Sequence, residues 1–181
     1  MDILSHGLWA VIVGKLYKQK SKRKCSLRWA FFWGIFPDVC AFTPAFLWLI
    51  AMLLGGNIVG FPLQEPAGQD SLPIFRLTSI IYNFSHSVVI FLAIAMIIVL
   101  LKYGYTKSTK NLLPLSLLGW PLHILMDIPT HSYRFFPTPF LWPLSSWKFN
   151  GFSWAQPWFM VVNYTAIIIL LVVLWRKKKK Q

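Results

Sequence analysis

The chain has 181 residues, of which 56% are hydrophobic, and a formal net charge of +13. The apolar residues are far more frequent than in a soluble domain and are gathered into long runs, which excludes a soluble globular protein. The basic residues flank these runs and no nucleic-acid-binding motif accompanies them, so we expect no nucleic-acid partner. The length fits one integral membrane domain over residues 1–181, with a short basic tail at 176–181.

Five apolar segments follow one another along the chain and predict an all-α, polytopic membrane helix bundle of about four to five spans. A spanning helix needs about 20 mainly apolar residues, and the second, third and fifth segments supply them. The fourth segment is slightly short. The first is marginal, and either spans the membrane or lies as a re-entrant or interfacial helix. The segments are residues 3–16, 29–54, 77–101, 112–128 and 154–175.

Basic residues concentrate in alternate connections, which predicts how the chain is oriented. They cluster at 15–28, 102–110 and 176–180, and cytoplasmic loops carry such an excess of Lys and Arg. The Gly- and Pro-rich connection 55–76 and the aromatic segment 132–153 then face the outside. This orientation predicts a cytoplasmic C-terminus, and an outside N-terminus if the first segment spans. Anionic lipid headgroups are the expected partners of the basic loops.

Ionisable residues within or beside the apolar segments are the strongest functional signal in the sequence. Such groups are costly at membrane depth and usually serve a function. Nitrogen and oxygen ligands gathered in a dry site are also what a zinc-like ion requires. We therefore predict a membrane-embedded metal site. Its expected ligands are His6, Asp38, His86, His123, Asp127 and His131.

The first candidate ligands lie in the first two segments. Asp2 and His6 are four residues apart, which fits a ligand at His6 and a carboxylate that orients it; the alternative is an exposed, frayed terminus. Asp38 follows Pro37, which is expected to break its helix. Asp38 then either binds or bridges metal ions and orients a water molecule, or caps a helix that begins near Ala41.

The remaining candidates lie in the third and fourth segments. His86 stands in an apolar helix, where a lone histidine more often forms a structural hydrogen bond, and only the other candidates favour it as a ligand. His123 and Asp127 are four residues apart, so a helix places both on one face; the alternative for this pair is a hydrogen bond between helices. Pro129 is expected to break that helix, and His131 can then turn back toward the pair.

These motifs resemble a bacterial family of inner-membrane proteins regarded as metal-dependent hydrolases. The resemblance covers most of the chain and implies a location in the bacterial cytoplasmic (inner) membrane. The motifs that carry it are His6, Phe36-Pro37-Asp38, His86-Ser87, His123-x-x-x-Asp127-x-x-Thr130 and the later Phe140-Leu-Trp-Pro143.

That family is in turn distantly similar to the zinc-dependent phospholipase C and single-strand nuclease group. Members of that group are all-helical phosphodiesterases. Their zinc ligands occur in the order seen here for His6, Asp38, His86, His123 and Asp127. The group completes its cluster with a downstream histidine and glutamate, and this chain has neither after its last histidine. The resemblance therefore implies one or two zinc ions rather than three.

The residues and the resemblance together predict a metal-dependent hydrolase acting on a phosphoester of a lipid or lipid-linked substrate. A metal ion lowers the pKa of its bound water toward neutrality and so supplies hydroxide near pH 7. Asp38 and Asp127 are the candidate catalytic residues. Two alternatives stay open. Buried His and Asp also form proton or metal-ion relays in transport proteins, and they also hold helices together in structural or regulatory membrane proteins.

Overall fold

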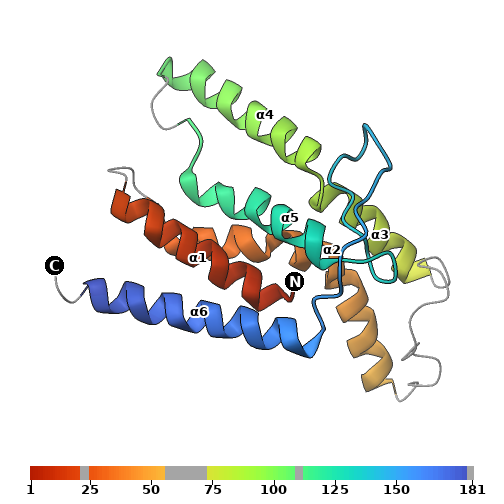
Figure 1. Ribbon diagram of the computed structural model, residues 1–181. Coiled ribbons are helices and arrows are strands. Elements are labelled where there is room, and N and C mark those ends of the chain that lie inside the picture. The colour runs from red at the N-terminus through yellow and green to blue at the C-terminus, as the bar shows by residue number, and fades with distance from the viewer. Residues whose placement is uncertain (21–24, 56–72, 109–111, 179–181) are drawn as a thin grey trace.

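The computed structural model describes residues 1–20, 25–55, 73–108 and 112–178. The prediction of an all-α bundle is confirmed for this part of the chain. Its helices are α1 (Ile3–Lys20), α2 (Leu27–Leu54), α3 (Pro73–Ser85), α4 (Val88–Thr106), the 3-10 helix η1 (Leu115–Leu118), α5 (Gly119–Thr130) and α6 (Pro157–Lys178). α2 contacts α1, α3 and α5, and α1 also contacts α5 and α6. α4 runs along one edge of the bundle (Figure 1).

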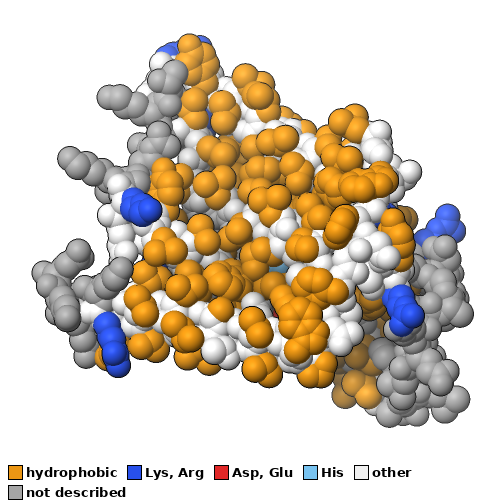
Figure 2. Space-filling model, viewed as in Figure 1, with side chains coloured by type: hydrophobic (Ala, Val, Ile, Leu, Met, Phe, Trp, Pro, Cys, Tyr) orange, Lys and Arg blue, Asp and Glu red, His pale blue; other side chains and the backbone are white. Residues whose placement is uncertain are grey.

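Three helices of the described part are long and apolar enough to cross a membrane: α2, α4 and the Pro157–Arg176 part of α6. Many of their large apolar side chains are exposed, among them Leu54, Leu101 and Val161. Figure 2 shows apolar side chains over most of one face of the molecule, with Lys and Arg toward its ends. In a chain with spanning helices, apolar surface of this extent faces lipid.

The other α-helices, α1, α3 and α5, are shorter than these three. α3 and α5 have 13 and 12 residues, fewer than a span requires. α1 has 18 residues and carries Lys18 and Lys20 in its last turn. The expected spans at 3–16 and 112–128 thus correspond largely to α1 and to η1 with α5.

The structure divides the expected segment 77–101 into α3 and α4. The division falls at His86 and Ser87, and Ser87 begins α4 by accepting a hydrogen bond from the Ile90 backbone N–H at 3.1 Å. Serine is favoured at this position because its hydroxyl satisfies an otherwise unpaired amide of the first turn. His86 therefore lies in a turn between two helices, where its ring is free to point into the bundle.

The prolines act differently in α2 and α5. α2 stays helical through Pro37 and Pro44, and its axis changes direction partway along its length (Figure 1). The expected break at Pro37 is therefore wrong: α2 continues through this residue and bends partway along its length, as proline often causes, and Asp38 lies inside the helix rather than capping one near Ala41. α5 ends at Thr130, directly after Pro129, as the sequence predicted.

Gly34 lets α1 and α2 approach closely. A Cβ atom at this position would lie 2.8 Å from the His6 carbonyl oxygen and 2.8 Å from the Ala10 Cβ. Small residues permit such backbone contact between membrane helices. The contact brings the start of α1, and with it His6, against the part of α2 that carries Asp38.

We expect Gly34→Ala to lower the free energy of unfolding by about 1–3 kcal/mol, because the added methyl group forces α1 and α2 apart. Thermal unfolding in detergent measures the effect. Gly104→Ala on α4 is the matched control, since nothing lies within 4 Å of the Cβ position there and alanine favours a helix. Equal melting temperatures for the two variants would show that the close approach at Gly34 is not required.

Candidate metal centre

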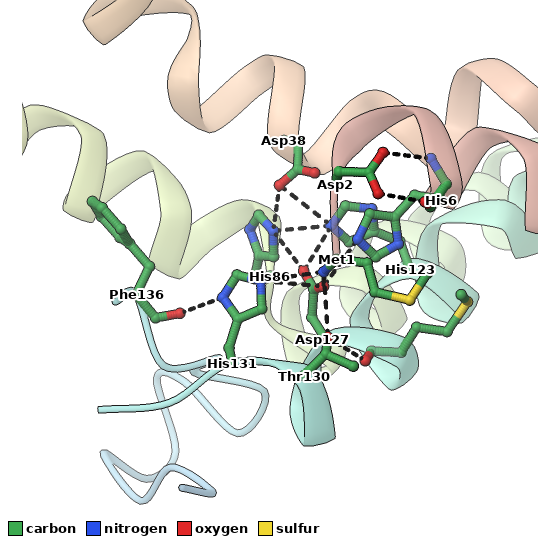
Figure 3. Close-up of polar contacts among 12 residues, drawn as sticks. Met1, Asp2, His6, Asp38, His86, His123, Asp127, Thr130, His131 and Phe136 are labelled. Carbon is green, nitrogen blue, oxygen red and sulfur yellow. Dashed lines mark hydrogen bonds and ion pairs between the residues drawn. The ribbon is translucent and has the colours of Figure 1, made fainter. Parts of the chain in front are cut away.

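The structure brings the six predicted ligands together, although 125 residues separate the first from the last. α1 contributes His6, α2 contributes Asp38 and the α3–α4 turn contributes His86. α5 contributes two more, and the last follows its end. All six are buried, with at most 3% of each residue exposed. Figure 3 shows their polar atoms pointing toward one another. The ligands from α5 and its end are His123, Asp127 and His131.

Four of these residues form one compact group: Asp38, His86, His123 and Asp127. The His86 and His123 Nε2 atoms are 3.0 Å apart. Asp38 Oδ1 lies 3.3 Å from His86 Nε2 and 3.6 Å from His123 Nε2. Asp127 Oδ2 lies 3.5 Å and 3.1 Å from the same two nitrogens. A tetrahedron of ligands about 2.0–2.1 Å from a zinc ion has edges of about 3.3–3.4 Å, so these five distances fit a metal ion.

Asp127 also faces a second group of residues. Its other oxygen, Oδ1, lies 2.9 Å from His6 Nε2 and 3.4 Å from His131 Nε2. The α-amino group of Met1 forms an ion pair with the same oxygen. One carboxylate thus presents a different oxygen to each of two histidine groups, which is the arrangement of a bridging ligand.

Hydrogen bonds on the far side of the rings orient two of these histidines. His123 Nδ1 donates to the Gly34 carbonyl at 2.7 Å, and His131 Nδ1 donates to the Phe136 carbonyl at 2.9 Å. A carbonyl only accepts, so each neutral ring directs the lone pair of its Nε2 into the cluster. Metal-bound histidines are commonly held in this way. The close approach of the His86 and His123 nitrogens needs a shared proton or cation between them.

Several buried polar atoms of the cluster have no hydrogen-bond partner within the described part of the chain. An unsatisfied buried polar atom costs about 1–3 kcal/mol, so a set of them in one place indicates a ligand. The His6 ring also stacks on His123, with the centroids 3.7 Å apart. The unsatisfied atoms are Nδ1 of His6 and Oδ2 of Asp38; His6 Nε2 and Asp127 Oδ2 also lack a hydrogen bond of good geometry, but face Asp127 Oδ1 and His123 Nε2 at 2.9 and 3.1 Å.

Asp2 does not orient His6, contrary to expectation. Its carboxylate accepts hydrogen bonds from the Ser5 backbone and hydroxyl and from the Tyr164 hydroxyl, the last at 2.7 Å. Asn163 adds to this contact by donating to the Ser5 hydroxyl at 2.8 Å. Asp2 therefore holds the start of α1 against α6, which fixes the position of His6 indirectly.

Two further groups at the cluster were not predicted. The Tyr82 ring stacks on His86 with centroids 3.7 Å apart, and its hydroxyl donates to the Phe136 carbonyl at 2.9 Å. Nothing in the sequence distinguishes a tyrosine that stacks on a candidate ligand from any other tyrosine in an apolar helix. The Met1 α-amino group lies 3.3 Å from both Thr130 Oγ1 and His131 Nε2, and a backbone group of this kind leaves no pattern in side chains.

The chain belongs to the YdjM inner membrane protein family, whose sequence profile matches residues 1–181. With its three apolar helices, the protein is therefore an integral inner membrane protein. No curated protein and no solved structure matches the chain. The similarity to zinc-dependent phospholipase C and single-strand nucleases thus stays a prediction from the order of the motifs.

Proposed function

We propose that this member of the YdjM inner membrane protein family is a membrane-embedded, metal-dependent hydrolase with zinc as its metal. The observation that carries the proposal is the group formed by Asp38, His86, His123 and Asp127. Five of the six distances between its ligand atoms, 3.0–3.6 Å, lie close to the edges of a zinc tetrahedron. Nitrogen and carboxylate ligands without sulfur fit zinc, and a buried site protects such ligands from water.

The second group around Asp127 supports a count of two ions. His6, His131 and Asp127 Oδ1 supply three ligand atoms around the place that the Met1 α-amino group takes in this structure, and catalytic zinc sites keep three protein ligands and an open position for water. The four-residue group already supplies four ligands and so leaves no open position for water. We therefore assign it to bind the first ion and to fix the position of Asp127. Two ions that share a carboxylate are common in phosphoester hydrolases.

The chain's own residues then have distinct roles. When bound, zinc supplies water of lowered pKa and polarises a phosphoryl oxygen. Asp127 fixes the two histidine groups relative to each other. Asp38 Oδ2 is buried and accepts no hydrogen bond in the described structure, so we assign it to accept the proton of the attacking water. The water oxygen forms a new P–O bond, the P–O bond to the leaving group breaks, and the proton passes to the leaving alkoxide.

A lipid or lipid-linked phosphoester is the proposed substrate class. The cluster is enclosed by helices whose outer surfaces are apolar, and a substrate dissolved in the membrane reaches such a site without crossing water.

We also propose that the C-terminus is cytoplasmic and that anionic lipid headgroups contact the basic ends of the helices. Lys18 and Lys20 end α1, Lys102 lies near the end of α4, and Arg176 lies near the end of α6. In Figure 1 these three helix ends lie toward the same side of the molecule. Because basic residues collect at the cytoplasmic face, their presence at all three ends supports placing these ends on the cytoplasmic side.

The test is zinc-dependent turnover by purified protein in vesicles of phosphatidylcholine and phosphatidylglycerol. We expect hydrolysis of a phosphoester in the lipid fraction, followed by mass spectrometry, that stops on chelation with EDTA and returns on addition of zinc. Asp38→Asn should lose turnover. Zinc uptake into sealed vesicles is measured in parallel. Zinc flux without any hydrolysis would replace the proposal with transport.

A further inference from the structure

A cavity of about 430 Å³ lies directly against the metal centre. Its volume falls within the range of about 300–1,000 Å³ found for small-molecule sites. Asp38 and His131 line it on the side of the cluster, and both are almost fully buried. In Figure 2 acidic and histidine side chains show only as small recessed patches among apolar ones. The cavity therefore leads from the apolar surface to the candidate ligands.

The wall formed by α2 becomes steadily more apolar and more exposed away from the cluster. Asp38, Phe42 and Phe46 line the cavity at intervals of four residues, so they form one stripe along the helix. Asp38 is 3% exposed, Phe42 is half-buried and Phe46 is 48% exposed. The stripe covers about 12 Å of helix axis. One end of it lies at the metal ligands and the other at the surface that faces lipid.

The opposite walls are mostly apolar, although Met1 and Asp2 also line the cavity. Leu4 of α1 and Phe135, in the segment that follows α5, line the cavity and are about half exposed. Trp154 completes this side, and its backbone N–H donates to the Thr130 carbonyl at 3.0 Å, which ties the wall to the end of α5. Neither lysine nor arginine lines the cavity. Met1 lines the cavity, and its α-amino group is paired with Asp127, so the walls beyond the cluster are dominated by apolar side chains.

We propose that this cavity binds the apolar chain of an amphiphilic substrate, with the bond to be hydrolysed held at Asp38 and His131. The inference rests on the proposed hydrolase function and specifies its substrate: a phosphoester that carries a long hydrocarbon chain and enters sideways from the membrane. Phe42, Phe46, Leu4 and Phe135 are then the residues that select for the chain.

The test compares two substrates with the same scissile bond, hexadecyl p-nitrophenyl phosphate and methyl p-nitrophenyl phosphate. Zinc-loaded protein is assayed in nanodiscs of dioleoylphosphatidylcholine. We expect Phe46→Gln to raise KM for the hexadecyl ester by about tenfold, with kcat and the rate for the methyl ester unchanged. Leu47→Gln is the matched control, because Leu47 is the next residue on α2, is 61% exposed and does not line the cavity.

An equal effect of Phe46→Gln on both esters, or no dependence of the wild-type KM on chain length, would overturn the inference. Failure of the hydrolase proposal itself appears as no turnover of either ester. For that case, a hexadecyl phosphate with a diazirine in its chain is photolysed in the same nanodiscs. We expect saturable labelling at Phe42, Phe46 and Phe135 that Phe46→Gln reduces. Labelling spread evenly over the exposed apolar helices would refute the cavity as a chain site without reference to catalysis.

Discussion

Replacing Asp127 by asparagine is expected to remove bound zinc from both histidine groups and to lower hydrolytic turnover by more than about 100-fold. The physical reason is the position of its two oxygens. Oδ1 lies 2.9 Å from His6 Nε2, and Oδ2 lies 3.1 Å from His123 Nε2. An amide of the same size keeps the packing but presents one neutral oxygen and one N–H donor, so it cannot serve two cations.

Metal content by mass spectrometry on detergent-purified protein measures this effect, alongside turnover in vesicles. Asp2→Asn is the matched control, because Asp2 has the same chemistry and lies in the same region but binds Ser5 and Tyr164. We expect it to retain zinc. If Asp127→Asn keeps its full zinc content, the carboxylate is not a ligand and the two-group arrangement is wrong.

The residues that meet in the cluster could be predicted from the sequence for a simple physical reason. Ionisable side chains are costly in apolar segments, so those that remain there mark a site. The spacing of His123 and Asp127 predicted a shared helix face, and the structure places both side chains in one cluster. Pro129 predicted where α5 ends, which allows His131 to turn back.

Other features depended on contacts that no local pattern records. Asp2 binds Tyr164, which is 162 residues away, so its partner could not be read from the four-residue spacing to His6. The continuity of α2 through Pro37 and Pro44 also escaped prediction, because a break and a bend give the same sequence signal. Ser87 did carry a signal, since serine before an apolar run favours a helix start. That signal separates α3 from α4 and accounts for the turn at His86.

Which histidines each oxygen of Asp127 faces is also determined by the fold and could not be predicted from the sequence. The sequence left open which carboxylate bridges, and Asp38 was the candidate considered. Among the described residues, Asp38 Oδ1 pairs with His86 and His123. By contrast, the stripe of Asp38, Phe42 and Phe46 is a four-residue repeat visible in the sequence. Its role as a cavity wall can be inferred only from the structure, because aromatic residues at helical spacing usually face lipid or a core.

Zinc is expected to raise the thermal stability of the protein strongly, and EDTA to lower it. At a free zinc concentration 1,000 times the dissociation constant, binding to the folded state alone contributes about 4 kcal/mol, or roughly 8–16 °C in melting temperature for a chain of this size. The reason is that Asp38 and Asp127 bring two carboxylates into a buried site, and a cation offsets their mutual repulsion and their loss of hydration.

Fluorescence-monitored unfolding in detergent, with and without zinc, measures this shift. Asp127→Asn is predicted to show almost no response to zinc. Its melting temperature in EDTA should fall below that of the wild type in EDTA, because the buried Met1 α-amino group loses the carboxylate with which it forms an ion pair. A wild-type melting temperature that responds to neither zinc nor EDTA would identify the cluster as a hydrogen-bonded contact between helices, the structural role that buried polar side chains play in other membrane bundles.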